Sequence, residues 1–354
     1  MVCIMDDQAV RSWAKEKLEV VSACPVCKST NKSELRNDLV DWFSDPPTGL
    51  WEMSRCSDCS VAYLASRPTE TSIKDAYSHY YTHTSEKDDL VNASLRSIKD
   101  SISEKYYSVA AHKSGGGLDY LVYLMARVFF PMASYFDAKS RHVFEATKGP
   151  GRLLDIGCGN GEFLRFADKF GWHVVGIDFD EGAVTAAKSE GLDVRVGGVE
   201  ILGGNEKFDF ISLSHVIEHV YDPIELLETC RSLLNEGGVL WLETPNVDSV
   251  GRVLYRSSWR GFEPPRHILL FNRESLRSLL LRLGYVSVEQ KMHGFSGVYM
   301  GLSSERLLNK ACPRDSFVGR VLRVSVKIMR VILLEFAQPF CRKRREFLTF
   351  VVHK

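Results

Sequence analysis

A glycine-rich turn between an apolar run and an amphipathic segment constrains the fold more than any other feature of this sequence. The stretch LLDIGCGNGEFL, residues 153–164, reads as a buried strand that runs into Gly157, Gly159 and Gly161 and then opens a helix. Glycines at such a turn let backbone N–H groups approach a ligand closely. Several nucleotide-binding folds share a GxGxG turn, so the surrounding sequence has to decide between them.

The pattern around this turn predicts an α/β fold. From about residue 150 to 292, short apolar runs alternate with helix-like segments, which is typical of a parallel sheet covered by helices. The strands are expected at 152–156, 174–177, 193–196, 208–213, 239–243 and 286–290. The helices are expected at 162–170, 181–190, 223–234 and 273–283.

The rest of the chain divides by composition. Residues 20–83 are rich in cysteine, proline and aromatic residues, and 84–149 read as a helical connecting region. Residues 293–345 form an apolar, basic helical region, and 346–354 are strand-like. Lys+Arg and Asp+Glu both number 45, and this zero balance argues against a protein that wraps a nucleic acid.

Two acidic residues near the glycine turn indicate a site for a nucleoside-containing cofactor rather than a phosphate-binding site. Asp155 precedes the glycines, and Asp178 ends the next strand, where a carboxylate can accept hydrogen bonds from ribose hydroxyls. Phe179 follows, placed to lie against an adenine ring. No Lys-Ser/Thr pair follows the glycines, so the turn is not a phosphate-binding P-loop.

The resemblance of this chain to a known family rests on the glycine turn and on four further sequence blocks. These blocks are residues 208–223, 234–246, 259–271 and 274–285. In this order the chain resembles the class I S-adenosylmethionine-dependent methyltransferases, in the subgroup related to ubiquinone-type and glycan-modifying enzymes. The resemblance implies a Rossmann-like, doubly wound, mostly parallel sheet of seven strands, with 346–354 as its last, antiparallel strand. A dehydrogenase or an inactive relative of the same fold is the alternative.

The resemblance also assigns the cofactor site. It implies that the methionine part of the cofactor contacts Asp155, Gly157, Gly159 and Gly161. It implies that Asp178 binds the ribose and that Phe179 lies against the adenine. Ser214 and His215 would line the sulfonium end. Family members often have an acidic residue facing the adenine amino group, where this chain reads Gly198-Val199-Glu200. Backbone groups near Val199 are expected to replace that contact.

Two cysteine pairs predict a metal site. Cys24 and Cys27, with Cys56 and Cys59, form a C-x2-C…C-x2-C set, which suits the tetrahedral thiolate coordination of structural zinc. A redox role is the other interpretation, but there are two pairs and neither opens a thioredoxin-like helix. Residues 61–83 resemble the segment that joins such modules to methyltransferase domains. Some sugar C-methyltransferases share the module, although this chain lacks their Tyr-Arg-Ser signature.

An acceptor hydroxyl or acidic carbon requires a general base. The candidates after the strands are His215, Glu218, His219, Glu243 and His267. His267, in the PPRHILLF loop, is the favoured base, with Arg266 orienting a polar acceptor and His219 as a second catalytic residue. The alternative is that His267 only holds the loop.

The C-terminal region, residues 317–345, has a pattern that suggests binding to a membrane surface. Arg320, Arg323, Lys327 and Arg330 step by three and four along the apolar run 317–340, and CRKRR follows at 341–345. The apolar segment 118–136 could act beside it. The alternative is a pair of helices that cap the catalytic domain or form a dimer interface.

Methyl transfer to a sugar or glycan intermediate is the favoured function, and the tail would suit a lipid-linked acceptor. A quinone or other small secondary metabolite is the second acceptor class. A zinc-module binding protein with a vestigial cofactor pocket is a third possibility, and RNA, disfavoured by the neutral charge, is a fourth. The first residues show no basic flank before an apolar run, so we expect a cytoplasmic protein, with the inner membrane surface as the site of any contact.

Overall fold

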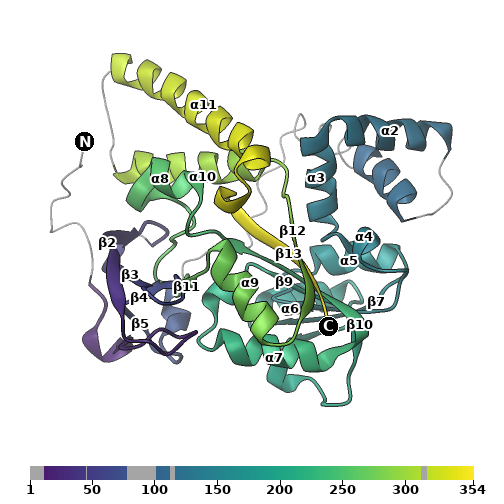
Figure 1. The fold of residues 1–354 in the computed structure, drawn as a ribbon, viewed down its shortest axis with the longest axis horizontal. Coiled ribbons are helices and arrows are strands. Elements are labelled where there is room, and N and C mark those ends of the chain that lie inside the picture. Colours follow the sequence, from purple (N-terminus) through teal and green to yellow (C-terminus); the bar gives the residue numbers. More distant parts are fainter. Residues whose placement is uncertain (1–11, 45, 78–100, 112–115, 312–316) are drawn as a thin grey trace.

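The computed structural model describes residues 12–44, 46–77, 101–111, 116–311 and 317–354, and of 317–323 the backbone alone. Two sheets organise the described chain (Figure 1). The larger has seven strands in the order β12-β13-β10-β9-β6-β7-β8. The smaller has four strands in the order β11-β4-β3-β2 and lies beside it.

The larger sheet is the predicted one. Its strands are β6 (Arg152–Ile156), β7 (His173–Asp178), β8 (Val194–Val196), β9 (Phe208–Ser214), β10 (Leu234–Pro245), β12 (Val286–Lys291) and β13 (Phe347–His353). Strands β8, β7, β6, β9 and β10 are parallel, whereas β13 lies antiparallel between β10 and β12. The Rossmann-like, mostly parallel seven-stranded fold is therefore confirmed.

Helices of the α/β unit begin where the sequence provides caps. They are α5 (Glu162–Lys169), α6 (Glu181–Ser189), α7 (Pro223–Leu233) and α9 (Arg273–Arg282), with the 3-10 turns η4 (Val199–Ile201) and η5 (Ile217–His219). The Asp180 carboxylate accepts hydrogen bonds from the first backbone N–H groups of α6, and Asp222 does the same for α7. Such caps satisfy N–H groups that have no partner within the helix.

The cysteine-rich region forms the smaller, antiparallel sheet. It contains β2 (Lys32–Asp41), β3 (Thr48–Cys56) and β4 (Ala62–Leu64), and β11 (Leu269–Leu270) adds the fourth strand. Strands β1 (Leu18–Val20) and β5 (Ser66–Pro68) pair separately, and η2 (Lys15–Lys17) and η3 (Ile73–Ala76) flank them. Strand β11 lies in the chain between β10 and β12 of the larger sheet, so the α/β region supplies the last strand of the smaller sheet.

The two parts also share a core. Val26 of the first cysteine turn and Tyr63 of β4 belong to the same buried cluster as Leu279 of α9 and Leu348 of β13. On the surface, the guanidinium of Arg55 donates two hydrogen bonds, of 2.7 and 2.9 Å, to the carboxylate of Asp248. The cysteine-rich module is therefore packed onto the α/β domain.

Helical additions cover the upper part of the molecule in Figure 1. Residues 101–110 are helical, and α2 (Gly117–Val128), α3 (Phe130–Lys139), α4 (Val143–Ala146), α8 (Val250–Tyr255), η6 (Arg256–Ser258), α10 (Ser296–Ala311), α11 (Phe317–Phe340) and η7 (Arg342–Arg344) follow. A Cβ on Gly297 would lie 2.7 Å from the backbone N of Glu335, so glycine lets α10 approach α11 closely. None of the helices in the described ranges combines the length and apolarity needed to cross a membrane.

Candidate active site

The glycine turn lies where β6 ends and α5 begins. Gly157 has a φ of +72°, and a Cβ there would lie 2.6 Å from the side chain of Val216. Gly159 and Gly161 also have positive φ values, of +53° and +80°. A Cβ on Gly159 would meet no heavy atom within 4 Å, so this stretch of backbone faces open space. The turn thus exposes backbone groups at the carboxyl edge of the sheet, where ligands of such folds bind.

Asp155 lies fully buried directly beneath this turn. The hydroxyl of Ser212 donates a 2.9 Å hydrogen bond to its Oδ1, and Arg141 forms an ion pair with the same oxygen. Oδ2 is buried and has no hydrogen-bond partner among the described residues. A buried carboxylate oxygen without a donor is costly. An ammonium group of a ligand in the turn would supply the missing donor.

Arg141 is a site residue that the sequence pattern did not reveal. It follows α3, has a φ of +51°, and its guanidinium lies 3.9 Å from the ring centroid of Phe163. It also donates a 2.7 Å hydrogen bond to Ser212. A cation and an unpaired acceptor at one end of the turn match the carboxylate and ammonium of an amino acid.

Asp178, at the end of β7, accepts hydrogen bonds from the backbone at the neighbouring part of the carboxyl edge of the sheet. Its Oδ2 accepts a 2.8 Å hydrogen bond from the backbone N–H of Gly159, and its Oδ1 accepts one of the same length from Asp180. Each carboxylate oxygen keeps a second lone pair, so a diol could still bind there. The side chain of Asp178 is half-buried and therefore accessible to a ligand.

The adenine end of the predicted site is open. Phe179 is 77% exposed, and a Cβ on Gly198 would lie 2.9 Å from its ring. Val199 begins η4 and is half-buried. The carboxylate of Glu200 folds back to accept a 2.8 Å hydrogen bond from the Gly198 N–H. The contact expected near Val199 stays a prediction, and Glu200 adds an acidic group to the same turn.

Ser214 and His215 lie at the end of β9, with Ser214 half-buried. His215 has a φ of +54° and donates its backbone N–H to the carbonyl of Glu243, at 2.9 Å. Its Nδ1 lies 3.1 Å from Glu218, and its Nε2 lies 3.7 Å from Glu243. Although burial opposes the charge, these two carboxylates raise the pKa of His215 to about 10. The two carboxylates therefore favour the protonated form of His215.

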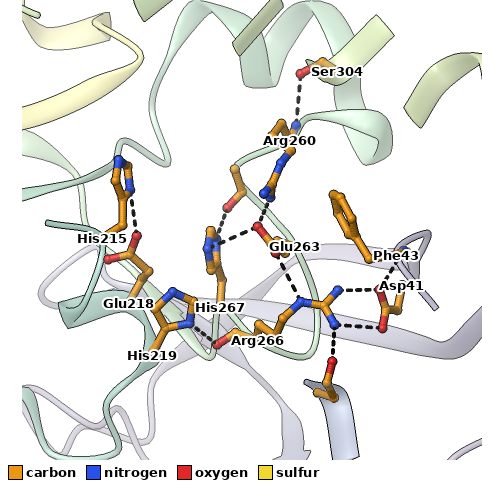
Figure 2. Close-up of polar contacts among 12 residues, drawn as sticks. Asp41, Phe43, His215, Glu218, His219, Arg260, Glu263, Arg266, His267 and Ser304 are labelled. Carbon is orange, nitrogen blue, oxygen red and sulfur yellow. Dashed lines mark hydrogen bonds and ion pairs between the residues drawn. The ribbon is translucent and has the colours of Figure 1, made fainter. Parts of the chain in front are cut away.

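The three predicted catalytic residues lie together, as Figure 2 shows. The rings of His219 and His267 meet edge to face, with centroids 4.8 Å apart. The Nδ1 of His219 lies 2.9 Å from the carbonyl of Arg266, and the Nδ1 of His267 lies 2.8 Å from that of Gly261. His267 is only 5% exposed, and burial holds its pKa well below the usual range. The role of His267 as base stays a prediction, now for a buried, neutral imidazole.

Arg266 points away from these rings and toward the small sheet (Figure 2). Its guanidinium, 1% exposed, donates to the carboxylates of Asp41 and Glu263 and to the carbonyl of Ala76. This arrangement joins the loop to the cysteine-rich module. The predicted contact of Arg266 with an acceptor remains untested, and its observed partners are all within the protein.

Glu243, near the end of β10, makes polar contacts with a second group of residues. Its carboxylate lies 2.8 Å from the Nδ1 of His293 and accepts a 2.6 Å hydrogen bond from the hydroxyl of Thr349. The carboxylate is buried, but its histidine partners hold its pKa well below the usual value. The sequence offered Glu243 as a candidate base, whereas it gave no sign of His293.

The four predicted metal ligands converge. The Sγ atoms of Cys24 and Cys59 lie 3.5 Å apart, those of Cys27 and Cys56 lie 3.4 Å apart, and all four lie within 4.8 Å of one another. Each cysteine pair lies in a turn closed by a backbone hydrogen bond. The N–H of Lys28 donates to the carbonyl of Cys24, and the N–H of Ser60 donates to the carbonyl of Cys56. Four sulfurs at this spacing suit one tetrahedral ion. Glu218, His219 and His267 are a second group within 4.8 Å, although each makes hydrogen bonds or ion pairs inside the protein.

A mostly parallel seven-stranded sheet, with a glycine turn after one strand and an acidic residue ending the next, is the arrangement expected for the class I S-adenosylmethionine-binding fold. The family model of a methyltransferase domain matches residues 131–290. This part of the chain is therefore a class I S-adenosylmethionine-dependent methyltransferase domain.

Curated relatives have similar sequences over part of the same region. A ubiquinone biosynthesis O-methyltransferase of Xanthomonas campestris pv. campestris is 37% identical over 103 residues, 27% of this chain and 43% of that protein. The protein of the same name from Caulobacter vibrioides is 39% identical over 118 residues, 31% of this chain and 45% of its own length. The chain thus spans less than half the length of these relatives.

An S-adenosylmethionine-dependent methyltransferase from Archaeoglobus fulgidus is 22% identical, with a TM-score of 0.42. That alignment covers 62% of this chain and 92% of the other.

Proposed function

We propose that the protein transfers the methyl group of S-adenosylmethionine to an oxygen of a small organic acceptor. The observation that carries this proposal is the buried, unpaired Oδ2 of Asp155 beneath the glycine turn. A site built only for stability would have no reason to leave that acceptor without a donor. It also argues against a vestigial pocket.

Several residues would hold the cofactor. Asp155 would accept from its ammonium, Arg141 would face its carboxylate, and Asp178 would accept from the ribose hydroxyls, with Phe179 against adenine. The bound cofactor supplies a methyl group on a sulfonium, which is a strong electrophile. The protein then has to align the acceptor oxygen and take up its proton.

The acceptor that we favour is a phenolic hydroxyl of a quinol. Support comes from the relatives, which are named ubiquinone biosynthesis O-methyltransferases. A sugar or glycan hydroxyl is the second candidate, because the cysteine-rich module resembles that of some sugar methyltransferases. Both acceptors present an oxygen with a proton to remove, so the same catalytic groups would serve.

The cysteine cluster would hold one zinc ion. Four thiolates leave no open coordination position, so this zinc would have a structural role. It would tie the turn at Cys24 to the end of β3 at Cys56, and both cysteines lie in the core shared with the α/β domain. Zinc would thereby stabilise the surface on which Arg266 is anchored.

An inner membrane surface is the location that we propose for the acceptor. Exposed apolar side chains line the two helices on the upper side of Figure 1, at Leu121, Leu124, Met125 and Val128 of α2 and at Ile328, Met329, Ile332 and Phe336 of α11. Exposed Arg342, Lys343 and Arg344 follow α11. Apolar groups beside cations suit an anionic lipid surface. Arg320 and Arg323, also expected to contribute, lie outside the described side chains.

The experiment is to incubate the purified protein and methyl-labelled S-adenosylmethionine with an extract of its own host, and then separate lipid, glycan, small-molecule, RNA and protein fractions. Label in a quinol of the lipid fraction is expected. Label in glycan would favour the second candidate acceptor. Label in protein or RNA would contradict both, and no label in any fraction would contradict methyl transfer itself.

A further inference from the structure

The histidines near the carboxyl edge of the sheet differ in what their ring nitrogens contact. His215 faces carboxylates from both nitrogens, and these favour its protonated form. His219 and His267 each use Nδ1 to contact a backbone carbonyl. A backbone carbonyl orients an imidazole but offers no negative charge to balance an imidazolium. The Nε2 of His267 also lies 3.5 Å from the carboxylate of Glu263, but Arg260 and Arg266 already pair with that carboxylate. Both rings are therefore poorly suited to gain a proton.

His293 has the contacts that a general base needs. Its Nδ1 lies 3.0 and 2.8 Å from the two carboxylate oxygens of Glu243. A carboxylate can only accept, so Nδ1 carries a proton, and in the neutral ring Nε2 keeps the lone pair. In the part of the chain that the structure describes, no hydrogen bond occupies Nε2. The side chain is 19% exposed, so a ligand can reach it.

The position of His293 is also suitable. It lies in the loop between β12 and α10, and its ring and that of His215 both pack on Phe347, with centroids 5.4 and 5.0 Å away. His215 follows Ser214 at the end of β9, where the reactive end of the cofactor is expected. The two histidines therefore flank one aromatic side chain at the edge where cofactor and acceptor meet.

We propose that His293 is the general base of methyl transfer and that Glu243 is its positioning residue. This inference rests on the proposed function. The Nε2 lone pair takes the proton of the acceptor hydroxyl while an oxygen lone pair forms the new bond to the methyl carbon. The electron pair of the broken carbon–sulfur bond stays on sulfur, which becomes a neutral thioether. The positive charge passes to the His293 imidazolium, where the Glu243 carboxylate balances it.

Other ionisable groups lie around this pair. Glu243 also faces His215, and burial together with Lys291 keeps the pKa of the neighbouring His142 at about 3. His142 accepts a hydrogen bond from the Trp241 indole at Nδ1 and is fully buried, so it remains neutral. Glu243 thus lies against both His293 and His215, while the buried His142 contributes no charge.

The test compares three variants in the labelling assay with the host fraction that the wild-type protein labels. His293→Asn should lower turnover by about 100-fold or more while leaving the affinity for S-adenosylhomocysteine unchanged. The rate of the wild-type enzyme should rise with pH to a plateau, and this rise should be absent from His293→Asn. Imidazole added to His293→Gly should restore part of the rate. His173→Asn, at an exposed site on the opposite edge of the sheet, should behave as wild type.

His267→Asn provides the competing result. If it abolishes both turnover and the pH-dependent rise while His293→Asn retains them, the base is His267 and the proposal is wrong. A wild-type enzyme that labels no fraction would instead refute the proposed function. A second measurement needs no acceptor: ¹⁵N NMR of the histidine rings should show the Nδ1–H tautomer for His293, and an Nε2–H tautomer would also refute the proposal.

Discussion

The guanidinium of Arg266 is bound by the carboxylate of Asp41, 225 positions earlier in the chain. Both side chains are almost completely buried. Asp41 ends β2 of the small sheet, and Arg266 precedes the predicted base His267. This ion pair, together with the hydrogen bond from Arg266 to the carbonyl of Ala76, connects the cysteine-rich module to the loop beside the candidate active site (Figure 2).

Asp41→Asn should destabilise the folded protein, because it leaves a buried guanidinium short of one negative partner. Breaking such a pair costs about 3 kcal/mol of unfolding free energy, which urea denaturation of the zinc-loaded protein would measure. Asp38→Asn is the matched control, since Asp38 pairs with Arg36 at the surface and should change stability by less than about 1 kcal/mol. Equal effects of the two variants would show that the buried pair contributes nothing special.

Asp178→Ala should weaken cofactor binding by about 1–3 kcal/mol, through the loss of hydrogen bonds to the ribose. Titration calorimetry with S-adenosylhomocysteine measures this directly. Asp168→Ala removes an exposed carboxylate of α5 and serves as the control. An unchanged affinity of the Asp178 variant would remove this residue from the cofactor site.

Purified protein should contain about one zinc ion per chain, measured by elemental analysis. Cys56→Ser should lower the zinc content and the melting temperature together, because metal binding and folding of such a module are coupled. Cys230→Ser changes a buried cysteine of α7 outside the cluster and should retain zinc. Retention of zinc by Cys56→Ser would place the metal elsewhere.

His215 and Glu218 should make stability depend on pH. The pKa of His215 is raised from 6.5 to about 10, so its contribution is complete below pH 6.5 and is lost as the pH rises toward 10. The pKa of Glu218 is lowered from 4.5 to about 2, so its contribution is complete above pH 4.5 and is lost as the pH falls toward 2. Both contributions are complete between pH 4.5 and 6.5.

The urea midpoint measured against pH checks this. His215→Gln should flatten the decline between pH 6.5 and 10, and His173→Gln should leave it as in the wild type. A decline of the same slope in His215→Gln would assign the pH dependence to other groups.

The sequence predicted the α/β unit well because its signals are local. The apolar run at 152–156 became β6 with the same bounds, and the glycines, whose backbone needs positive φ, marked the turn. The expected antiparallel strand at the end of the chain is β13. Periodicity and turn chemistry act within a few residues, so they can be read without a structure.

The site was less predictable because its key contacts join distant segments. Arg141 enters the cofactor site from the helical connecting region, and His293 meets Glu243 across 50 positions. Neither residue belongs to a motif, and no local pattern distinguishes them from other basic residues. The acceptor contact suggested for Arg266 stays a prediction, whereas its bonds to Asp41 and Ala76 of the small module join distant segments and could not be read from the sequence.

The pairing of β4 with β11 has a consequence for how the chain assembles. During synthesis, the four cysteines and β2, β3 and β4 emerge long before Leu269 and Leu270, which complete their sheet. Until then β4 presents an unpaired strand edge, the kind of surface to which another chain can add. The excised module would keep that edge permanently. The strand that covers this edge, β11, is encoded some 200 residues downstream of β4. The cysteine-rich module and the α/β domain are therefore expected to fold as one unit.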